Sequence, residues 1–145
     1  MADEWDDAEE LRAAIGDFVR RVRADDGMPR GQTAVLGHLS RVGPLPIAEL
    51  ARLEQVRHQS MTRTVGLLHD QGLVALTPDE SDRRRVVVAA TAAGEQRLAD
   101  ERRRRAAGIA RAIREDLTDD EREVVRRLPG ILRKLRPFGE APGTR

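Results

Sequence analysis

The chain has 145 residues, a length that fits one domain of ordinary size. Its hydrophobic fraction of 39% is too high for a disordered chain, and no apolar stretch approaches the roughly 20 residues that cross a bilayer. Six acids among the first ten residues are the reverse of a secretion signal, so we expect a cytoplasmic chain without membrane contact. The lack of cysteine excludes disulfides, thiolate nucleophiles and cysteine zinc sites.

Apolar residues recur at helical spacing in six segments. The predicted helices cover residues 6–24, 30–41, 46–53, 58–71, 92–116 and 119–136. The second and third helices would bury Val35, Leu36, Leu39, Val42, Ile47, Leu50, Ala51 and Leu53. Gly72 would end the fourth helix in a left-handed conformation, and Thr118 with Glu121 fits a capping box before the sixth. Pro129 predicts a kink in that last helix, and we expect the tail from residue 137 to be frayed.

Two short apolar runs, residues 73–76 and 85–90, flank a polar loop with turn-forming residues and predict a β-hairpin with a charged tip. A helix-turn-helix followed directly by a β-hairpin is the layout of a winged helix, whose second helix fits the major groove of DNA. We therefore expect a mainly α single domain, residues 1–145, with a small β-hairpin wing. The winged helix-turn-helix would cover about residues 46–91, between dimerisation helices at about 6–24 and 92–136.

The helix over residues 58–71 turns polar side chains away from its apolar stripe of Met61, Val65 and Leu68. We expect DNA contacts from Arg57, His58, Gln59, Ser60, Thr62 and Arg63. Arg63 can recognise guanine through two parallel hydrogen bonds, and Gln59 can do the same with adenine. Arg57 and His58 suit phosphate. The alternative is a solvated helix face, and the hairpin that follows favours DNA.

The predicted hairpin tip holds Asp82, Arg83, Arg84 and Arg85 in succession. Three adjacent guanidinium groups repel one another unless an anion lies nearby, and a phosphate backbone or a narrow minor groove would supply it. Asp82 could hold one of the arginine side chains extended. A solvated turn with weak local ion pairs is an equally good interpretation of the tip alone.

Together these segments resemble the MarR (multiple antibiotic resistance regulator) family of bacterial transcription factors over about residues 6–136. The resemblance rests on Glu49-Leu50-Ala51, Gln59-Ser60-Met61-Thr62-Arg63-Thr64-Val65, Leu68-His69-Asp70-Gln71-Gly72-Leu73-Val74, Asp82-Arg83-Arg84 and Ala90-Thr91-Ala92-Ala93-Gly94. It implies a homodimer in which residues 59–64 enter the major groove and Arg84, oriented by Asp82, enters the minor groove. It also brings a small-molecule effector into consideration as a partner.

Two features depart from the family's pattern. The turn from Glu54 to Arg57 lacks the glycine often found there, which leaves the start of the following helix open. The missing cysteine means that the peroxide-sensing branch of the family is not a model for this chain.

Dimerisation is expected because one helix reads too few base pairs, whereas two helices related by a twofold axis read a palindrome. The predicted interface consists of Leu11, Ile15, Phe18, Val22, Leu128, Leu132 and Leu135. The opposite charges of residues 1–56 and 97–145 would favour such an assembly.

The leading hypothesis is a sequence-specific DNA-binding regulator, most simply a repressor. The alternative is a winged-helix module that binds a protein. An enzyme is a remote third choice, and we expect neither a cofactor nor a metal site, because His38, His58 and His69 lack ligand spacing.

Overall fold

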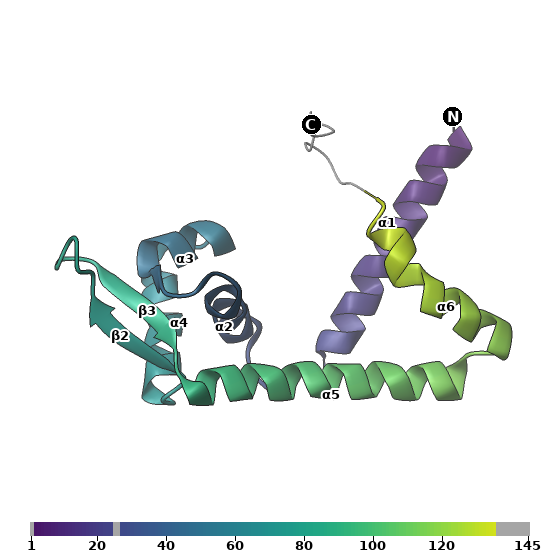
Figure 1. Cartoon of the computed structure of the whole chain (residues 1–145). Helices are drawn as coiled ribbons and strands as arrows, with labels where there is room; N and C mark the ends of the chain where they lie inside the picture. The colour runs from purple at the N-terminus through teal and green to yellow at the C-terminus, as the bar shows by residue number, and fades with distance from the viewer. Residues whose placement is uncertain (1, 25–26, 136–145) are drawn as a thin grey trace, which may run out of the picture. The chain divides into compact units, whose positions relative to one another are not determined.

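The computed structural model describes residues 2–24 and 27–135. The chain divides into two compact units, residues 1–107 and 108–145. Figure 1 shows the elements, whose bounds are α1 (Ala2–Arg23), α2 (Arg30–Val42), β1 (Leu45–Pro46), α3 (Ile47–Glu54), α4 (His58–Asp70), β2 (Val74–Pro78), β3 (Val86–Ala90), α5 (Ala92–Asp116) and α6 (Asp119–Leu132). The predicted frayed tail from residue 137 lies outside the described residues.

The first unit contains a winged helix, as predicted. Its β2 and β3 pair in antiparallel register from Val74 opposite Ala90 to Pro78 opposite Val86. The sheet also has a third strand, β1, which pairs with β3 and gives the order β1-β3-β2. The strand β1 was not predicted, because two residues are too few to show an alternating pattern. The loop between β2 and β3 projects beyond α3 and α4 (Figure 1).

The hydrophobic core of the first unit is built from aliphatic residues of α2, α3, α4, the sheet and α5. Its fully buried members include Leu36, Leu50, Leu68 and Val88. The stripe of Met61, Val65 and Leu68 on α4 is buried as expected. Burial of this stripe fixes which face of α4 remains on the surface.

Two residues assigned to the core are on the surface. Val42 is 66% exposed and Leu53 is 36% exposed. Each lies at the end of its helix, where the chain turns away from the core before the stripe completes another turn. Periodicity places residues on a face but does not show where that face stops being covered.

Helix boundaries agree closely with the expected ones except at the ends of the chain. Helix α1 begins four residues before the predicted start, with Asp3 and Glu4 in its first turn, where acids favour the helix dipole. Helix α6 ends at Leu132, earlier than predicted. Thr91 caps α5 by accepting a hydrogen bond from the Gly94 amide at 3.1 Å.

The second unit joins the end of α5 to α6. The capping box is confirmed, because Thr118 Oγ1 accepts from the Glu121 amide and a Glu121 carboxylate oxygen accepts from the Thr118 amide. Arg122 ties the two helices together, since its guanidinium donates to the carbonyls of Ile113 at 3.1 Å and Arg114 at 2.6 Å. In the described part of the chain, none of the helices has the length and apolar character needed to span a bilayer.

Candidate nucleic-acid interface

The turn between α3 and α4 is closed without glycine. Gln55 takes up the left-handed conformation itself, with φ 53° and ψ 41°. Its amide donates to the carbonyl of Arg52 at 3.2 Å, and the Val56 amide donates to the carbonyl of Ala51 at 3.1 Å. The helix-turn-helix geometry is therefore complete, but a side chain occupies a conformation that L-residues adopt at a cost.

Replacing Gln55 by glycine should raise the free energy of unfolding by about 0.5 to 1 kcal/mol, because glycine adopts positive φ without steric strain. Urea unfolding followed by circular dichroism measures the change. Gln55→Ala is the matched control, since alanine keeps the strained Cβ and should give no comparable gain. A glycine variant no more stable than the alanine variant would contradict a left-handed Gln55.

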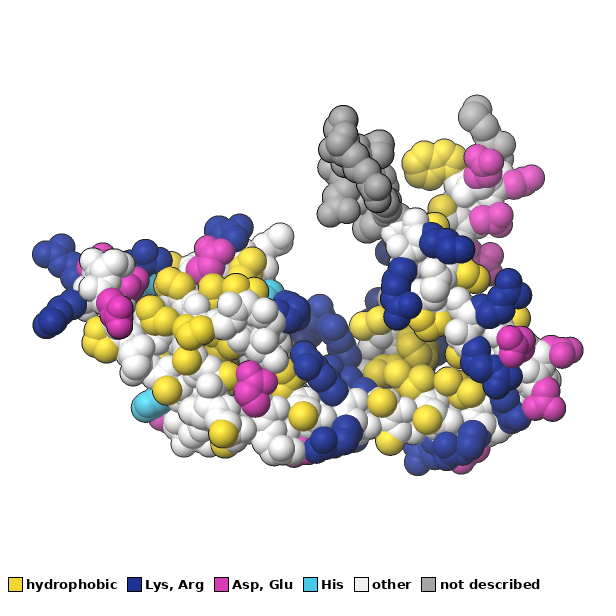
Figure 2. All heavy atoms as spheres, in the orientation of Figure 1, with side chains coloured by type: hydrophobic (Ala, Val, Ile, Leu, Met, Phe, Trp, Pro, Cys, Tyr) yellow, Lys and Arg dark blue, Asp and Glu magenta, His cyan; other side chains and the backbone are white. Residues whose placement is uncertain are grey.

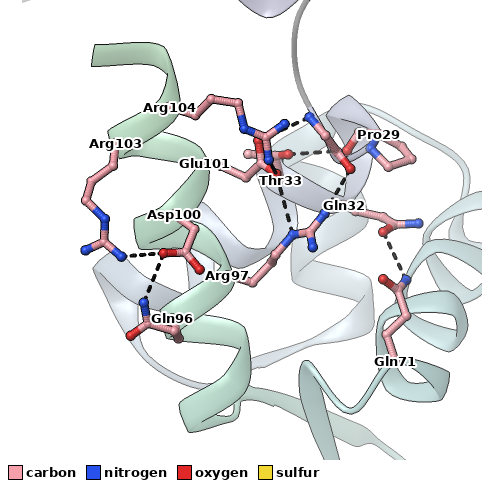
Figure 3. A network of polar contacts seen from close by, with 11 residues as sticks. Pro29, Gln32, Thr33, Gln71, Gln96, Arg97, Asp100, Glu101, Arg103 and Arg104 are labelled. Atoms are coloured by element: carbon pink, nitrogen blue, oxygen red, sulfur yellow. Dashed lines mark hydrogen bonds and ion pairs between the residues drawn. The ribbon is translucent and has the colours of Figure 1, made fainter. Parts of the chain in front are cut away.

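Two polar contacts from α2 hold the ends of the helix-turn-helix. At the end of α3, Glu54 Oε1 lies 2.5 Å from His38 Nε2. At the end of α4, the side-chain amide of Gln71 donates to Gln32 Oε1 at 3.2 Å, and Gln32 is buried (Figure 3). These contacts and the buried stripe fix α4 against the core, so its outward side chains are presented on a rigid support.

The outward face of α4 carries the side chains expected to contact DNA. Arg57, His58, Gln59, Ser60, Thr62 and Arg63 are all exposed, and Thr64 is half-buried. The hydroxyls of Thr62 and Thr64 donate to the carbonyls of His58 and Ser60, so their protons are used within the helix. Within the described ranges, the guanidinium groups of Arg57 and Arg63 have no hydrogen-bond or ion-pair partner. They are available to an external anion or base edge.

The start of α4 adds backbone donors to this face. Arg57 is the N-cap residue, and its side chain makes no capping hydrogen bond. The first intrahelical bond runs from the Met61 amide to the Arg57 carbonyl at 3.1 Å, so the amides of the first turn point outward. Outward amides at a helix N-terminus suit a phosphate oxygen.

The wing loop between β2 and β3 is shaped by two aspartates. Asp79 Oδ1 accepts from the amide of Ser81 at 3.0 Å and from its hydroxyl at 2.9 Å. These hydrogen bonds, the backbone one first, hold the pKa of Asp79 below its ordinary value. Asp82 Oδ1 accepts from the amide of Arg84 at 3.0 Å, so it orders the backbone of the tip. Asp79 was not among the predicted site residues, although an Asp two residues before a Ser indicates such a turn.

The three wing arginines differ in their surroundings. Basic side chains gather at the projecting tip, with acids beside them (Figure 2). The hydrogen bond from Arg52 holds the pKa of the Glu49 carboxyl on α3 below its ordinary value, and the positive charge of Arg85 adds a smaller effect in the same direction. The guanidinium groups of Arg83 and Arg84 have no partner in the part of the chain that the structure describes. Arg85 therefore faces acids of its own domain, while Arg83 and Arg84 are free for another molecule.

The winged-helix part of the chain matches a known family. A model described as the MarR family matches residues 26–85, a range that includes α2, α3, all of α4 and the wing loop. Over these residues the chain is similar to the MarR family of transcriptional regulators. The match includes the exposed residues of α4 and of the wing loop described above. It does not identify which of those residues touch DNA, and their roles stay predictions.

The chain is also similar to individual proteins from other bacteria. The Transcriptional activatory protein BadR of Rhodopseudomonas palustris is 41% identical over 68 residues, which are 45% of this chain and 38% of that protein. A Pseudomonas aeruginosa crystal structure has a TM-score of 0.81 at 24% identity and covers 97% of this chain and 99% of its own. A MarR family protein from Bacillus stearothermophilus has a TM-score of 0.63 at 22% identity, covering 92% of each chain. At these identities the two structures show the fold.

The described residues contain no group of three His, Asp or Glu side chains that could hold a metal ion. His38 is mostly buried against Glu54, and His58 contacts Thr62 at the start of α4. Each of these two histidines thus has a polar partner within the first unit.

Proposed function

We propose that this chain is a homodimer that binds a palindromic operator through α4 and the wing, and that it represses transcription by blocking polymerase. Gln59 and Arg63 contact base edges in the major groove, with Ser60, Thr62 and Thr64 beside them. Arg57 and His58 contact phosphate, and Arg84 enters the minor groove beside Arg83. Arg85 and Asp82 shape the wing. The dimer is formed by α1 and by the last helix.

The observation that carries this proposal is the set of exposed guanidinium groups without partners in the described residues, those of Arg57 at the N-cap of α4, Arg63 on α4, and Arg83 and Arg84 on the wing. Unpaired cations fixed on a rigid element are favourable only in water or against an anion. A duplex offers closely spaced phosphates to both segments, and it gives Gln59 and Arg63 specific acceptors in the major groove. A protein partner would need an acidic surface of the same shape.

Substitutions in α4 and in the wing should change DNA binding in different ways. Gln59→Ala and Arg63→Ala should each lose about 1 to 3 kcal/mol of preference at particular base pairs. Arg84→Ala should weaken all sequences alike and reduce the salt dependence of binding by about one phosphate contact. Fluorescence anisotropy against an operator selected from genomic fragments, and against single-base variants of it, measures both effects.

Arg103→Ala is the control for this series, because Arg103 is exposed and paired with Asp100 on α5. It should bind like the wild-type protein. If all three interface variants also bind like the wild-type protein, the proposed docking is wrong. A wild-type protein whose weak DNA affinity hardly responds to salt would instead support a protein-binding module.

The direction of regulation requires its own measurement. The relative from Rhodopseudomonas palustris bears the name of an activator. Repression predicts that the selected operator overlaps the polymerase site and that a reporter downstream becomes more active when the protein is removed. Activation predicts an upstream operator and the opposite response.

We further propose that an anionic effector binds in a pocket of the first unit. The pocket has a volume of about 300 Å³ and lies among residues of α1, α2, α3 and α5. Its charged and titratable lining consists of Arg23, Arg30, His38, Arg41, Glu54, Arg102 and Arg105. Five arginines against one acid favour a carboxylate, and Ala34 and Leu98 supply apolar wall. Glu54 precedes the turn to α4, so a ligand here has a direct route to the recognition helix.

Phenylacetate and its uncharged counterpart phenylacetamide test this pocket. The carboxylate should stabilise the protein, by about 2.7 kcal/mol at a hundred times its Kd, and should lower operator affinity, whereas the amide should do neither. Arg102→Gln should weaken the response to phenylacetate. Equal thermal shifts with acid and amide would contradict an anion site.

A further inference from the structure

A buried carboxylate clamps the connection between α1 and α2 onto α5. Glu101 of α5 is 0% exposed and is the single buried charged residue in the described part of the chain. Its Oε2 accepts from the Gly27 amide at 3.3 Å, and its Oε1 lies 3.0 Å from Arg104 Nη2 and 3.5 Å from Arg97 Nε. Arg97 in turn donates to the Gly27 carbonyl at 2.9 Å (Figure 3). The backbone amide and the backbone carbonyl of Gly27 are thus both hydrogen-bonded to side chains of α5.

The backbone at Gly27 fits closely against this network. A Cβ added there would lie 2.4 Å from Arg104 Nη1. Burying an ionised carboxylate is costly, and a well-packed apolar side chain often stabilises a fold as well as a buried ion pair does. What directional bonds add is a single geometry for the two segments they join, whereas apolar contacts allow small shifts.

The two segments joined by these bonds, the α1–α2 connection and α5, are those that link the winged helix to the rest of the chain. Gly27 lies between the end of α1 at Arg23 and the start of α2 at Arg30. Helix α5 follows β3 and carries the chain out of the wing. Helix α1 bears a row of exposed apolar residues, among them Ile15 and Phe18, that a second copy of this chain would cover. Gly27, which lies in the connection from α1 to the winged helix, is thus bonded to α5 through both its amide and its carbonyl.

We propose that Glu101 and Arg97 are positioning residues for operator recognition, because their clamp on Gly27 sets the separation of the two α4 helices in the dimer. The proposal rests on the proposed function, a dimer formed through α1 that binds two half-sites. Half-site centres lie about 34 Å apart along the duplex, so one base pair corresponds to about 3.4 Å. A small change in the direction of α1 is enough to move one recognition helix by that distance.

Operators with altered half-site separation test the clamp directly. Binding is measured for duplexes in which the half-sites are moved by −1, 0, +1 and +2 base pairs. The wild-type dimer should prefer one separation by at least tenfold over its neighbours. Glu101→Gln and Arg97→Met should keep half-site recognition but reduce that preference to less than about threefold. Arg103→Gln, on the same helix but paired with Asp100, should keep the wild-type profile.

The possible outcomes distinguish the positioning role of Glu101 and Arg97 from the proposed DNA-binding function on which it rests. If Glu101 contributed only stability, both variants would lower the melting temperature and leave the ratio between separations unchanged, which would overturn the proposal. Should Glu101→Gln fail to fold, Arg97→Met decides alone, because Arg97 is partly exposed and its loss leaves Arg104 beside the carboxylate. A wild-type protein that is monomeric, or that binds no DNA, would overturn the proposed function and the clamp with it. If the wild-type protein and both variants shared the same sharp preference for one half-site separation, the positioning role would be wrong and the proposed function would stand.

Discussion

Replacing Gly94 by alanine should lower the free energy of unfolding by about 3 kcal/mol or more, the upper end of the range for overpacking a core. A Cβ at this position would lie 2.0 Å from the carbonyl oxygen of Leu73 and 3.3 Å from Leu36 Cδ2. The Leu73 carbonyl cannot rotate away, because it accepts a hydrogen bond from the Thr91 amide at 3.1 Å. The first turn of α5 would have to move off the sheet. Urea unfolding at a fixed protein concentration measures the loss.

Gly108 provides the matched control on the same helix. Nothing lies within 4 Å of a Cβ placed there. Gly108→Ala should therefore stabilise the protein by about 0.5 to 1 kcal/mol, the difference in helix propensity. Opposite signs for the same substitution would show that contact with Leu73 outweighs propensity. Equal effects at the two positions would mean that α5 does not approach the sheet as described.

Local sequence patterns predicted the helices and the hairpin of the winged helix because these elements are determined by nearby residues. The stripe of Met61, Val65 and Leu68 fixes the outward face of α4 by periodicity alone. Thr91 and Thr118 begin their helices with their own side chains, and Gly72, with φ 72°, ends the turn after α4 as expected. Such signals depend on residues one to four positions apart, which a sequence displays directly.

The features that escaped prediction depend on residues far apart in the chain. Glu101 falls beside a run of arginines that suggests a solvated helix, yet its partner Gly27 is 74 residues away. The strand β1 exists because β3 lies beside it, and the Gln55 conformation is set by the packing of two helices. Periodicity carries no information about these pairings. They need the tertiary structure.

The exposure of the proposed DNA-contacting residues was predicted, whereas the partners of the wing arginines were not. Outward exposure of Gln59 and Arg63 follows from the helical period, whereas the difference between Arg85 and its two neighbours follows from Glu49 and Asp79. Charge clusters in a sequence indicate a surface that attracts anions. Only the tertiary structure shows which of these arginines already lies near an acidic side chain of the same chain.

A charge placed on the apolar face of α1 or α6 should abolish dimerisation and, with it, most of the operator affinity. Phe18 is 45% exposed and Leu128 is 38% exposed, and α6 has no buried residue in its described length. In a twofold interface each substitution occurs twice, and an apolar side chain of this size contributes about 1.5 to 3 kcal/mol when buried. A buried unpaired carboxylate adds a further penalty. Phe18→Glu or Leu128→Glu should therefore raise the dimer dissociation constant by at least about a thousandfold.

Sedimentation velocity at micromolar concentration should show a monomer for either variant and a dimer for the wild-type protein. Ala13→Glu is the control, because Ala13 is exposed on the opposite side of α1 and adds the same charge. Operator affinity should fall by at least a hundredfold in the monomeric variants, since a single half-site forfeits the second set of contacts. Affinity for an isolated half-site should stay unchanged, because α4 and the wing lie outside the altered faces. A monomeric variant that binds the full operator like the wild-type protein would show that one winged helix is sufficient for binding. The proposal of a palindromic operator would then be wrong.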